Sequence, residues 1–424
     1  MTSRLRLSWS SPAGRGFIML AVMQMAYGFA SAANNSTVTN YFEEVLYFSG
    51  PQFGYMTAIR ELGGLLLIIL MALLYRVSLQ RLTAGAMLLM GVGFALYSVA
   101  SDFWTLIPWM LIGSFGMHTV LQTQYSLGMS LTTQERSGHV LGKMAAFGQL
   151  GTFAALIVVF LVFHFGLFSF VPTFIIMGVV GFIGAVAIFR FPNLFEGEER
   201  EMAPKREPIV WRRDYRLYYW LNLLDGVRQQ IFFSFGLWVL VNRFRLSVAE
   251  ISLLLMTVTI VGVFSSPYVG RLIDRLGERR VLQSINLGYV VALGGYALSG
   301  NVYLACFFYV IYSFIFPFST IGASTYLRKI AVPADVAPSL AMGVTILHAT
   351  AVVVPVVAGF ILNFVGYQVP FFIACIAALV TVAVTHRLDP ASQRTAARVA
   401  LDEARSAERA KTAAAAAADA GSSM

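Results

Sequence analysis

Two small groups of ionisable residues interrupt long apolar stretches of the sequence. Arg60 and Glu61 are adjacent, whereas Asp225 and Arg228 are three residues apart and would share one face of a helix. An ionisable side chain at mid-membrane costs about 2.5–3.5 kcal/mol on insertion scales, so each needs a partner or a function. Guanidinium groups bind carboxylates and phosphates through paired hydrogen bonds, and a desolvated carboxyl group can carry a proton. The sequence therefore predicts either neutralising ion pairs or sites for an anion and a proton.

Two histidines, His118 and His348, also fall within apolar stretches. Imidazole titrates near neutral pH, which makes both residues candidate proton carriers. A single histidine in a helix is more often a hydrogen-bonded packing residue, so that interpretation also stays open. Together with the acidic residues, the predicted proton-coupling set is Glu61, Asp225, His348 and His118.

No grouping in the sequence predicts catalysis or a prosthetic group. The two cysteines, Cys306 and Cys375, lie in apolar stretches and show no metal-ligand spacing. A Ser-His-Asp group, a pair of catalytic carboxylates and an ATP-binding loop are not recognisable. We therefore expect no enzymatic activity, no cofactor and no bound metal.

The composition indicates which kind of protein must position these side chains. The 424 residues are 58% hydrophobic and only 12% charged, about half the roughly 25% charged share of a soluble domain. The mean hydropathy is +0.72. This apolar surplus predicts an all-α integral membrane protein. The net charge of +9 does not indicate nucleic-acid binding, because Lys and Arg form short clusters along the chain instead of one basic face.

The spacing of the basic clusters predicts the number of membrane crossings. When four isolated arginines are set aside, six stretches without Lys or Arg remain, each with room for two spans of about 20 residues and a turn. We therefore expect twelve transmembrane helices. They run roughly over residues 16–41, 52–75, 82–100, 104–127, 140–164, 168–189, 215–241, 248–270, 281–299, 303–327, 339–364 and 368–386.

The same clusters predict the orientation. Lys and Arg mark cytoplasmic loops, so both termini are expected in the cytoplasm, with Glu43 and Asp102 outside. Arg243 and Arg245 are exceptions to this rule. The first apolar stretch has a polar outer half that is unfavourable in lipid but tolerable beside a watery cavity. Its polar residues are Gln24, Tyr27, Asn34, Asn35, Thr39 and Asn40.

A long polar stretch divides the chain into two similar halves. Sliding one half over the other places Pro51–Leu82 over Ala249–Arg280, and both stretches are an apolar helix that runs into a basic turn. We predict two pseudo-symmetric six-helix bundles. The expected divisions are a cytoplasmic N-terminus (1–15), a first bundle (16–190), a cytoplasmic linker (191–214), a second bundle (215–387) and a disordered Ala-rich cytoplasmic tail (388–424).

The most specific motif is the stretch 270–280, which reads GRLIDRLGERR and forms a hydrophilic turn between two predicted spans. Its glycines permit a tight turn, and its Asp can accept hydrogen bonds from nearby arginines. In a chain of six plus six spans with a charged linker, this motif resembles the major facilitator superfamily, over residues 16–387. The matching first-half stretch, residues 72–81, reads ALLYRVSLQR and lacks the glycines and the Asp.

The resemblance implies roles for these residues. The motif would act as a latch for the outward-facing state, through Gly270, Asp274, Arg275, Gly277 and Arg279. Helices 1, 4, 7 and 10 would line a central cavity, with helix 2 beside helix 11, so that the ionisable residues could reach one chamber. The predicted substrate-binding set is Arg228, Asp225, Arg60, Glu61, Asn34, Tyr27, Gln229 and His348.

We interpret the chain as a secondary active transporter of a small organic solute that works by alternating access and is coupled to protons. An organic anion is favoured, because two arginines and two histidines suit a carboxylate or phosphate. One alternative is an efflux pump for amphiphilic drugs, and one from another class is a non-transporting membrane receptor. The Arg and Ala bias is typical of GC-rich bacterial sequences, so we expect the protein in the bacterial inner (plasma) membrane. We also expect it to be a monomer.

Overall fold

The computed structural model of the chain describes residues 11–74, 76–132, 137–192, 211–404, 406–408 and 412. Within these ranges every regular element is helical and no strand occurs. The residues outside these ranges belong to the predicted N-terminus (1–10), the first bundle (75 and 133–136), the linker (193–210) and the tail (405, 409–411 and 413–424).

The helices follow the predicted apolar stretches closely. In the first half they are α1 (Pro12–Asn40), η1 (Tyr41–Val45), α2 (Gly50–Leu65), α3 (Leu67–Leu73), α4 (Leu79–Ala95), η2 (Leu96–Val99), α5 (Phe103–Ser130), α6 (Ser137–His164) and α7 (Phe170–Phe189). In the second half they are η4 (Arg213–Tyr215), α8 (Arg216–Asn242), α9 (Val248–Leu276), α10 (Glu278–Leu298), α11 (Val302–Ile330), α12 (Pro333–Val365) and α13 (Gln368–Thr385).

Most of these helices can cross a bilayer. Among the described residues, ten helical stretches are long and apolar enough to do so. The helices α8 and α9 have 27 and 29 residues, and at about 1.5 Å per residue each exceeds a hydrocarbon core of about 30 Å. The predicted class of all-α membrane protein is confirmed. The twelve predicted spans correspond to twelve helical stretches when α2 and α3 are counted together.

The second predicted span, residues 52–75, differs from a single helix. It divides at Leu66 into α2 and the short α3. Gly63 and Gly64 precede the division, and glycine costs about 1 kcal/mol relative to alanine inside a helix. Both glycines pack closely against side chains of neighbouring helices, so the local sequence favours tertiary contact over a continuous helix.

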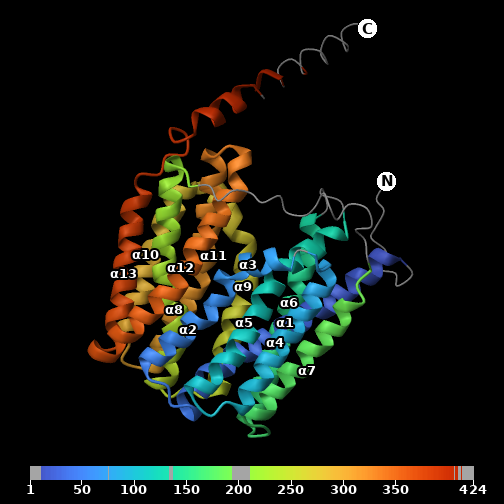
Figure 1. Ribbon diagram of the computed structural model, residues 1–424. Helices are drawn as coiled ribbons and strands as arrows, with labels where there is room; N and C mark the ends of the chain where they lie inside the picture. Colours follow the sequence, from blue (N-terminus) through green and yellow to red (C-terminus); the bar gives the residue numbers. More distant parts are fainter. Residues whose placement is uncertain are drawn as a thin grey trace.

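The helices form two groups that meet along two seams (Figure 1). In the first half α1 packs against α6 and α7, and α4 packs against α5 and α7; in the second half α8 packs against α12 and α13, and α10 packs against α11 and α13. Between the halves, α2 packs against α12 and α6 packs against α9. We call the end with the start of α1 and the end of α13 the terminal end, and the opposite end the distal end.

Polar residues begin and end the helices where the sequence changes from polar to apolar. The Ser11 hydroxyl accepts a hydrogen bond from the Gly14 amide at the start of α1, and Ser247 and Glu250 form a capping box at the start of α9. The Asp102 carboxylate caps α5 by accepting from the Thr105 amide at 2.9 Å. This hydrogen bond holds the pKa of Asp102 below its ordinary value.

The first part of the predicted disordered tail is ordered. Residues 396–404 are helical, and the start of this helix, with Thr395 just before it, is tied to the α11–α12 junction. The Thr395 amide donates to the Ile330 carbonyl at 3.2 Å, and Arg398 donates to the Ala331 carbonyl at 3.2 Å. These carbonyls lie at or just after the C-terminus of α11, where carbonyls lack helical partners, which explains why the polar tail docks there.

Candidate functional site

A polar cluster of Glu61, His118 and His348 lies where α2, α5 and α12 meet. Glu61 Oε2 is 3.8 Å from Nε2 of His118 and 3.6 Å from Nδ1 of His348. The two imidazole rings are arranged edge to face, with their centroids 5.7 Å apart. Because α2 and α5 belong to the first half and α12 to the second, this Glu-His-His cluster connects the two halves inside predicted membrane spans.

The hydrogen bonds of His118 determine which nitrogen faces Glu61. Nδ1 of His118 is 2.9 Å from the Ser114 carbonyl oxygen, one helical turn earlier. A carbonyl oxygen only accepts, so Nδ1 carries a hydrogen and donates it. In neutral His118 the lone pair is therefore on Nε2, the atom nearest Glu61.

Two glycines create the space for this cluster. A Cβ atom on Gly64 would lie 2.5 Å from Cε1 of His348 and 2.8 Å from Cδ2 of His118. A Cβ atom on Gly63 would collide with Ser114. The glycine pair of the second predicted span thus allows α5 and α12 to approach α2 closely.

Arg60 binds the other oxygen of the Glu61 carboxylate, Oε1. Its Nε and Nη2 atoms are both 3.3 Å from Glu61 Oε1. The Arg60 side chain is 32% exposed, compared with 14% for Glu61. Glu61 therefore faces a guanidinium with one oxygen and two imidazoles with the other.

The second charged pair is enclosed within the second half. Arg228 is fully buried, and its guanidinium donates to the Tyr312 hydroxyl at 2.9 Å, to Ser319 at 3.3 Å and to Asp225. The guanidinium carbon also lies 3.4 Å from the centre of the Tyr289 ring. Ser319 in turn donates to Asp225 at 2.9 Å. This arrangement pins α8 to α10 and α11.

The structure thus sorts the predicted chamber residues into two separate groups. Within the described residues, no hydrogen bond or ion pair joins the Arg228 group to the Glu-His-His cluster. Arg228 lines no open space in this conformation, so its substrate-binding role stays a prediction. Among the other predicted residues, Tyr27 and Gln229 are half-buried. Asn34 is buried, and its Oδ1 atom has no hydrogen-bond partner among the residues that the structure describes.

Polar contacts also join the halves at the distal end, and sequence reasoning missed them. Asn40 Nδ2 donates to the Leu246 carbonyl at 2.8 Å. Glu43 accepts a hydrogen bond from Asn242 and lies 3.8 Å from Arg245 Nη1. The available signal was electrostatic, because Arg245 breaks the positive-inside pattern and Glu43 was predicted on the same side.

Aromatic side chains reinforce this distal contact. The Phe53 ring of α2 has its centroid 6.0 Å from that of Phe235 and 6.3 Å from that of Trp238, both on α8. All three side chains are buried. We call the residues Asn40, Glu43, Phe53, Phe235, Trp238, Asn242, Arg245 and Leu246 the distal contact. It holds the two halves together at the end opposite the termini.

The predicted latch motif spans the end of α9 and the start of α10. Gly270 lies inside α9, and Gly277 separates the two helices with a φ of +78°, a conformation that favours glycine. Asp274 and Arg275 are exposed, and neither makes a hydrogen bond or ion pair within the described part of the chain. Arg279 Nη2 lies 3.3 Å from Nδ1 of His386.

Two buried acids at the terminal end form ion pairs that the sequence reasoning missed. Glu278 Oε1 is 2.7 Å from Lys329 Nζ, which ties the start of α10 to the end of α11. Asp335 accepts from Tyr215 at 2.8 Å and pairs with Arg212, which ties α12 to the start of α8. These contacts lie within the second half and do not cross to the first.

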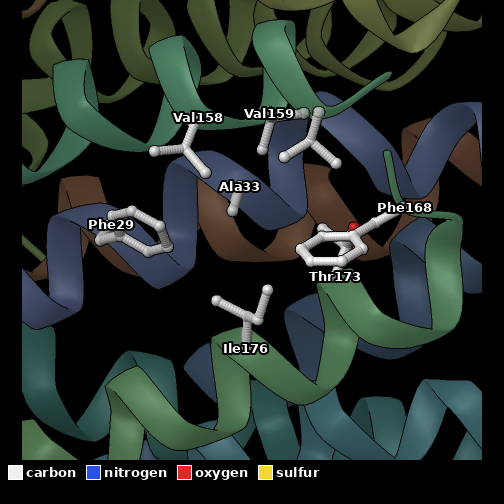
Figure 2. A pocket seen from close by; sticks show the side chains of 8 residues that line it. Phe29, Ala33, Val158, Val159, Phe168, Thr173 and Ile176 are labelled. Carbon is white, nitrogen blue, oxygen red and sulfur yellow. The ribbon is translucent and has the colours of Figure 1, made fainter. Parts of the chain in front are cut away.

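A small apolar pocket lies between α1, α6 and α7 (Figure 2). It is lined by Phe29, Ala33, Val158, Val159, Val162, Phe168, Thr173 and Ile176. The single hydroxyl there, on Thr173, donates to the Ser169 carbonyl at 2.8 Å. The pocket therefore offers no free polar group, and it shares no residue with the Glu-His-His cluster.

Comparison with known proteins agrees with this architecture. The family model described as Major Facilitator Superfamily matches residues 218–415. No curated protein sequence matches the chain significantly.

Solved structures share the whole fold at low sequence identity. A mutant of the nucleoside transporter NupG is 15% identical with a TM-score of 0.74, and the alignment covers 88% of this chain and 99% of that one. A bacterial homologue of the human lysosomal transporter Spinster, in an inward-facing and occupied conformation, is 12% identical with a TM-score of 0.71, covering 90% and 98%.

A mutant of the peptide transporter POT in complex with sulfate is 16% identical, with a TM-score of 0.67 and coverage of 88% and 94%. Each of these three proteins is a transporter. The family match is confined to residues 218–415, whereas the fold shared with these transporters extends over both halves, so the chain has the all-α, multi-pass membrane fold of these transporters.

Proposed function

We propose that the chain is a transporter of the major facilitator superfamily, that it is secondary active and moves a small organic solute by alternating access, and that a proton is the coupling ion. The observation that carries the proposal is the Glu-His-His cluster. In it, Glu61 and His118 of the first half meet His348 of the second half at the seam between α2, α5 and α12. Opening this seam must separate His348 from Glu61. Gain or loss of a proton in the cluster would therefore change the stability of the arrangement with this seam closed relative to the arrangement with it open.

The distal contact supports a particular state of the cycle. Asn40, Glu43 and Phe53 of the first half bind residues of the second half at that end. At the terminal end, Asp274 and Arg275 of the predicted outward-state latch engage no described residue. We infer a conformation closed at the distal end with the latch released, which the cycle must reverse.

We propose Glu61, His118 and His348 as the coupling residues, ahead of Asp225. Asp225 is bound by Arg228 and Ser319 inside one half, whereas the Glu-His-His cluster spans both halves. A carboxylate inside one half can gain or lose a proton without changing the contacts between the halves. Gain or loss of a proton in the Glu-His-His cluster does change those contacts.

We infer that an organic anion would meet Arg60 instead of Arg228. The Arg60 side chain is 32% exposed, whereas the Arg228 guanidinium is already held by Tyr312, Ser319 and Asp225. We also propose that the protein is a monomer, that it lies in the bacterial inner membrane, and that both termini are in the cytoplasm. The basic residues at the terminal end support that orientation.

The test begins with a thermal-stability screen of carboxylates, phosphates, nucleosides, peptides and lipophilic cations on the detergent-solubilised protein. A ligand at 100 times its Kd adds about 2.7 kcal/mol, which is readily detected. Compounds that stabilise the protein then enter flux assays in sealed proteoliposomes, with and without a pH gradient. We expect the gradient to drive accumulation, and Glu61→Gln to abolish that drive.

The matched control is Asp214→Asn, which removes an exposed acid before α8 and should leave flux unchanged. Binding of a solute without any flux would favour the receptor alternative. Flux of lipophilic cations alone, insensitive to Arg60→Gln, would favour drug efflux.

A further inference from the structure

The donor atoms of the Glu-His-His cluster have the chemistry and the spacing of a metal site. One ligand atom from each of Glu61, His118 and His348 lies within 4.8 Å of the other two. Two imidazoles and one carboxylate are a ligand set that Zn²⁺ and related ions take in proteins. We propose that this cluster binds one divalent transition-metal ion, such as Zn²⁺ or Co²⁺, and that the ion bridges the two halves of the transporter.

The distances require only small movements. Metal–ligand bonds of about 2.1 Å in tetrahedral geometry place neighbouring donor atoms about 3.4 Å apart. Oε2 of Glu61 is 3.6 Å from Nδ1 of His348 and 3.8 Å from Nε2 of His118. Shifts of a few tenths of an ångström would bring Glu61 into range of both histidines. The two imidazoles, whose ligand atoms lie within 4.8 Å of each other, would approach each other by at most about 1.4 Å.

The surroundings orient the ligands. The Ser114 carbonyl accepts the Nδ1 hydrogen of His118 at 2.9 Å, which leaves Nε2 with its lone pair toward the ion. This is the contact that typically orients a metal-binding histidine. The imidazole of His348 is 24% exposed, so an ion can reach the site and a fourth position can take water or another ligand.

Arg60 sets the charge of the site. Its guanidinium holds Glu61 Oε1 through two contacts at 3.3 Å and neutralises the carboxylate, leaving Oε2 for the ion. A cation next to a guanidinium is repelled, so the site should bind more weakly than its donors alone would. We therefore expect Arg60→Gln to bind the ion more tightly than the unsubstituted protein, whereas loss of a ligand should weaken binding.

The test uses the full-length protein, purified with a tag that contains no histidine and stripped of metal. Titration with Co²⁺ is followed by visible d–d absorption, and Zn²⁺ is then added as a competitor. We expect one Co²⁺ per chain, displaced by Zn²⁺. We also expect His118→Gln and His348→Gln each to weaken binding at least about 10-fold, and Arg60→Gln to strengthen it.

His139→Gln and His164→Gln are the matched controls, because both histidines are exposed and outside the cluster. They should leave the titration unchanged. Thermal unfolding of each metal-free variant checks that it is folded, and Glu61→Gln replaces His118→Gln if the latter is not. Absence of Co²⁺ binding, or equal loss in the control variants, would overturn the proposal.

A second measurement addresses the bridge between the halves and rests on the proposed transport function. Zn²⁺ should inhibit flux of the unsubstituted protein at the concentrations that displace Co²⁺, and a chelator should restore that flux. The control variant His139→Gln should be inhibited to the same extent. Metal binding without any flux would refute the transport proposal alone. Flux without metal binding would refute the metal site alone.

Discussion

At the scale of single residues, Gly64 is the position on which the Glu-His-His cluster depends most directly. Both imidazoles pack where its side chain would be, with a Cβ atom 2.5 Å from His348 and 2.8 Å from His118. The cluster is therefore a consequence of backbone space as well as of ionisable side chains. Replacing a hydrogen by a methyl group at this position tests that relation.

We expect Gly64→Ala to lower stability by about 1–3 kcal/mol, because the methyl group overpacks the seam and displaces at least one imidazole. Thermal unfolding measures the effect. Gly85→Ala is the matched control, since a Cβ atom there meets nothing within 4 Å and alanine is the better helix former. Equal destabilisation by both substitutions would contradict the packing argument.

Arg228 permits a second test at this scale. Arg228→Gln leaves the Asp225 carboxylate in the interior without its cation, which typically costs about 3–5 kcal/mol. We expect a large loss of thermal stability, partly restored in the double variant Asp225→Asn/Arg228→Gln. A substrate-binding role predicts a different result: a raised KM for anions at nearly unchanged stability.

At the scale of elements, capping residues outside the membrane determine where helices begin. Asp102 is exposed and holds the first turn of α5, the helix that carries His118. Its pKa lies below the ordinary value of 3.8, because backbone hydrogen bonds favour the charged carboxylate. A lowered pKa in the folded state means that the stabilisation is present above 3.8 and is lost as the pH falls through the folded-state pKa.

We therefore expect Asp102→Ala to unfold at a lower temperature than the unsubstituted protein at pH 7. The difference should shrink and disappear under strongly acidic conditions, where Asp102 is protonated. Unfolding temperatures across a pH series provide the measurement. A difference that stays constant at low pH would show that Asp102 acts through something other than its charge.

At the scale of the whole molecule, the two halves meet through the distal contact and along the α2–α12 and α6–α9 seams. Alternating access requires the distal contact to open. Glu43 and Asn242 lie across it and are hydrogen-bonded to each other. A covalent link between these positions would hold that end closed.

We expect the double variant Glu43→Cys/Asn242→Cys to lose flux on oxidation and to recover it on reduction. The controls are the single variants Glu43→Cys and Asn242→Cys, which cannot form the link and should keep their flux on oxidation. Flux in sealed proteoliposomes is the readout. Full flux with the inter-half link formed would refute alternating access at this end.

The sequence alone determined the membrane class, the helical spans and the local pairs. Hydropathy and the positions of Lys and Arg are local properties of the sequence. An apolar segment in lipid must satisfy its own backbone hydrogen bonds and therefore forms a helix. Adjacent Arg60 and Glu61, and Asp225 and Arg228 at a spacing of three, had their partners within one turn of helix and form the expected pairs.

Only the tertiary structure decided which of these groups share a site. His118 and His348 reach Glu61 because α5 and α12 both pack closely against a glycine pair of α2, which no local pattern predicts. Arg228 was expected beside them but is enclosed by Tyr312, Ser319 and Tyr289. The physical reason is that residues far apart in the chain meet according to which helix faces approach closely. That choice depends on side-chain packing over the whole interface.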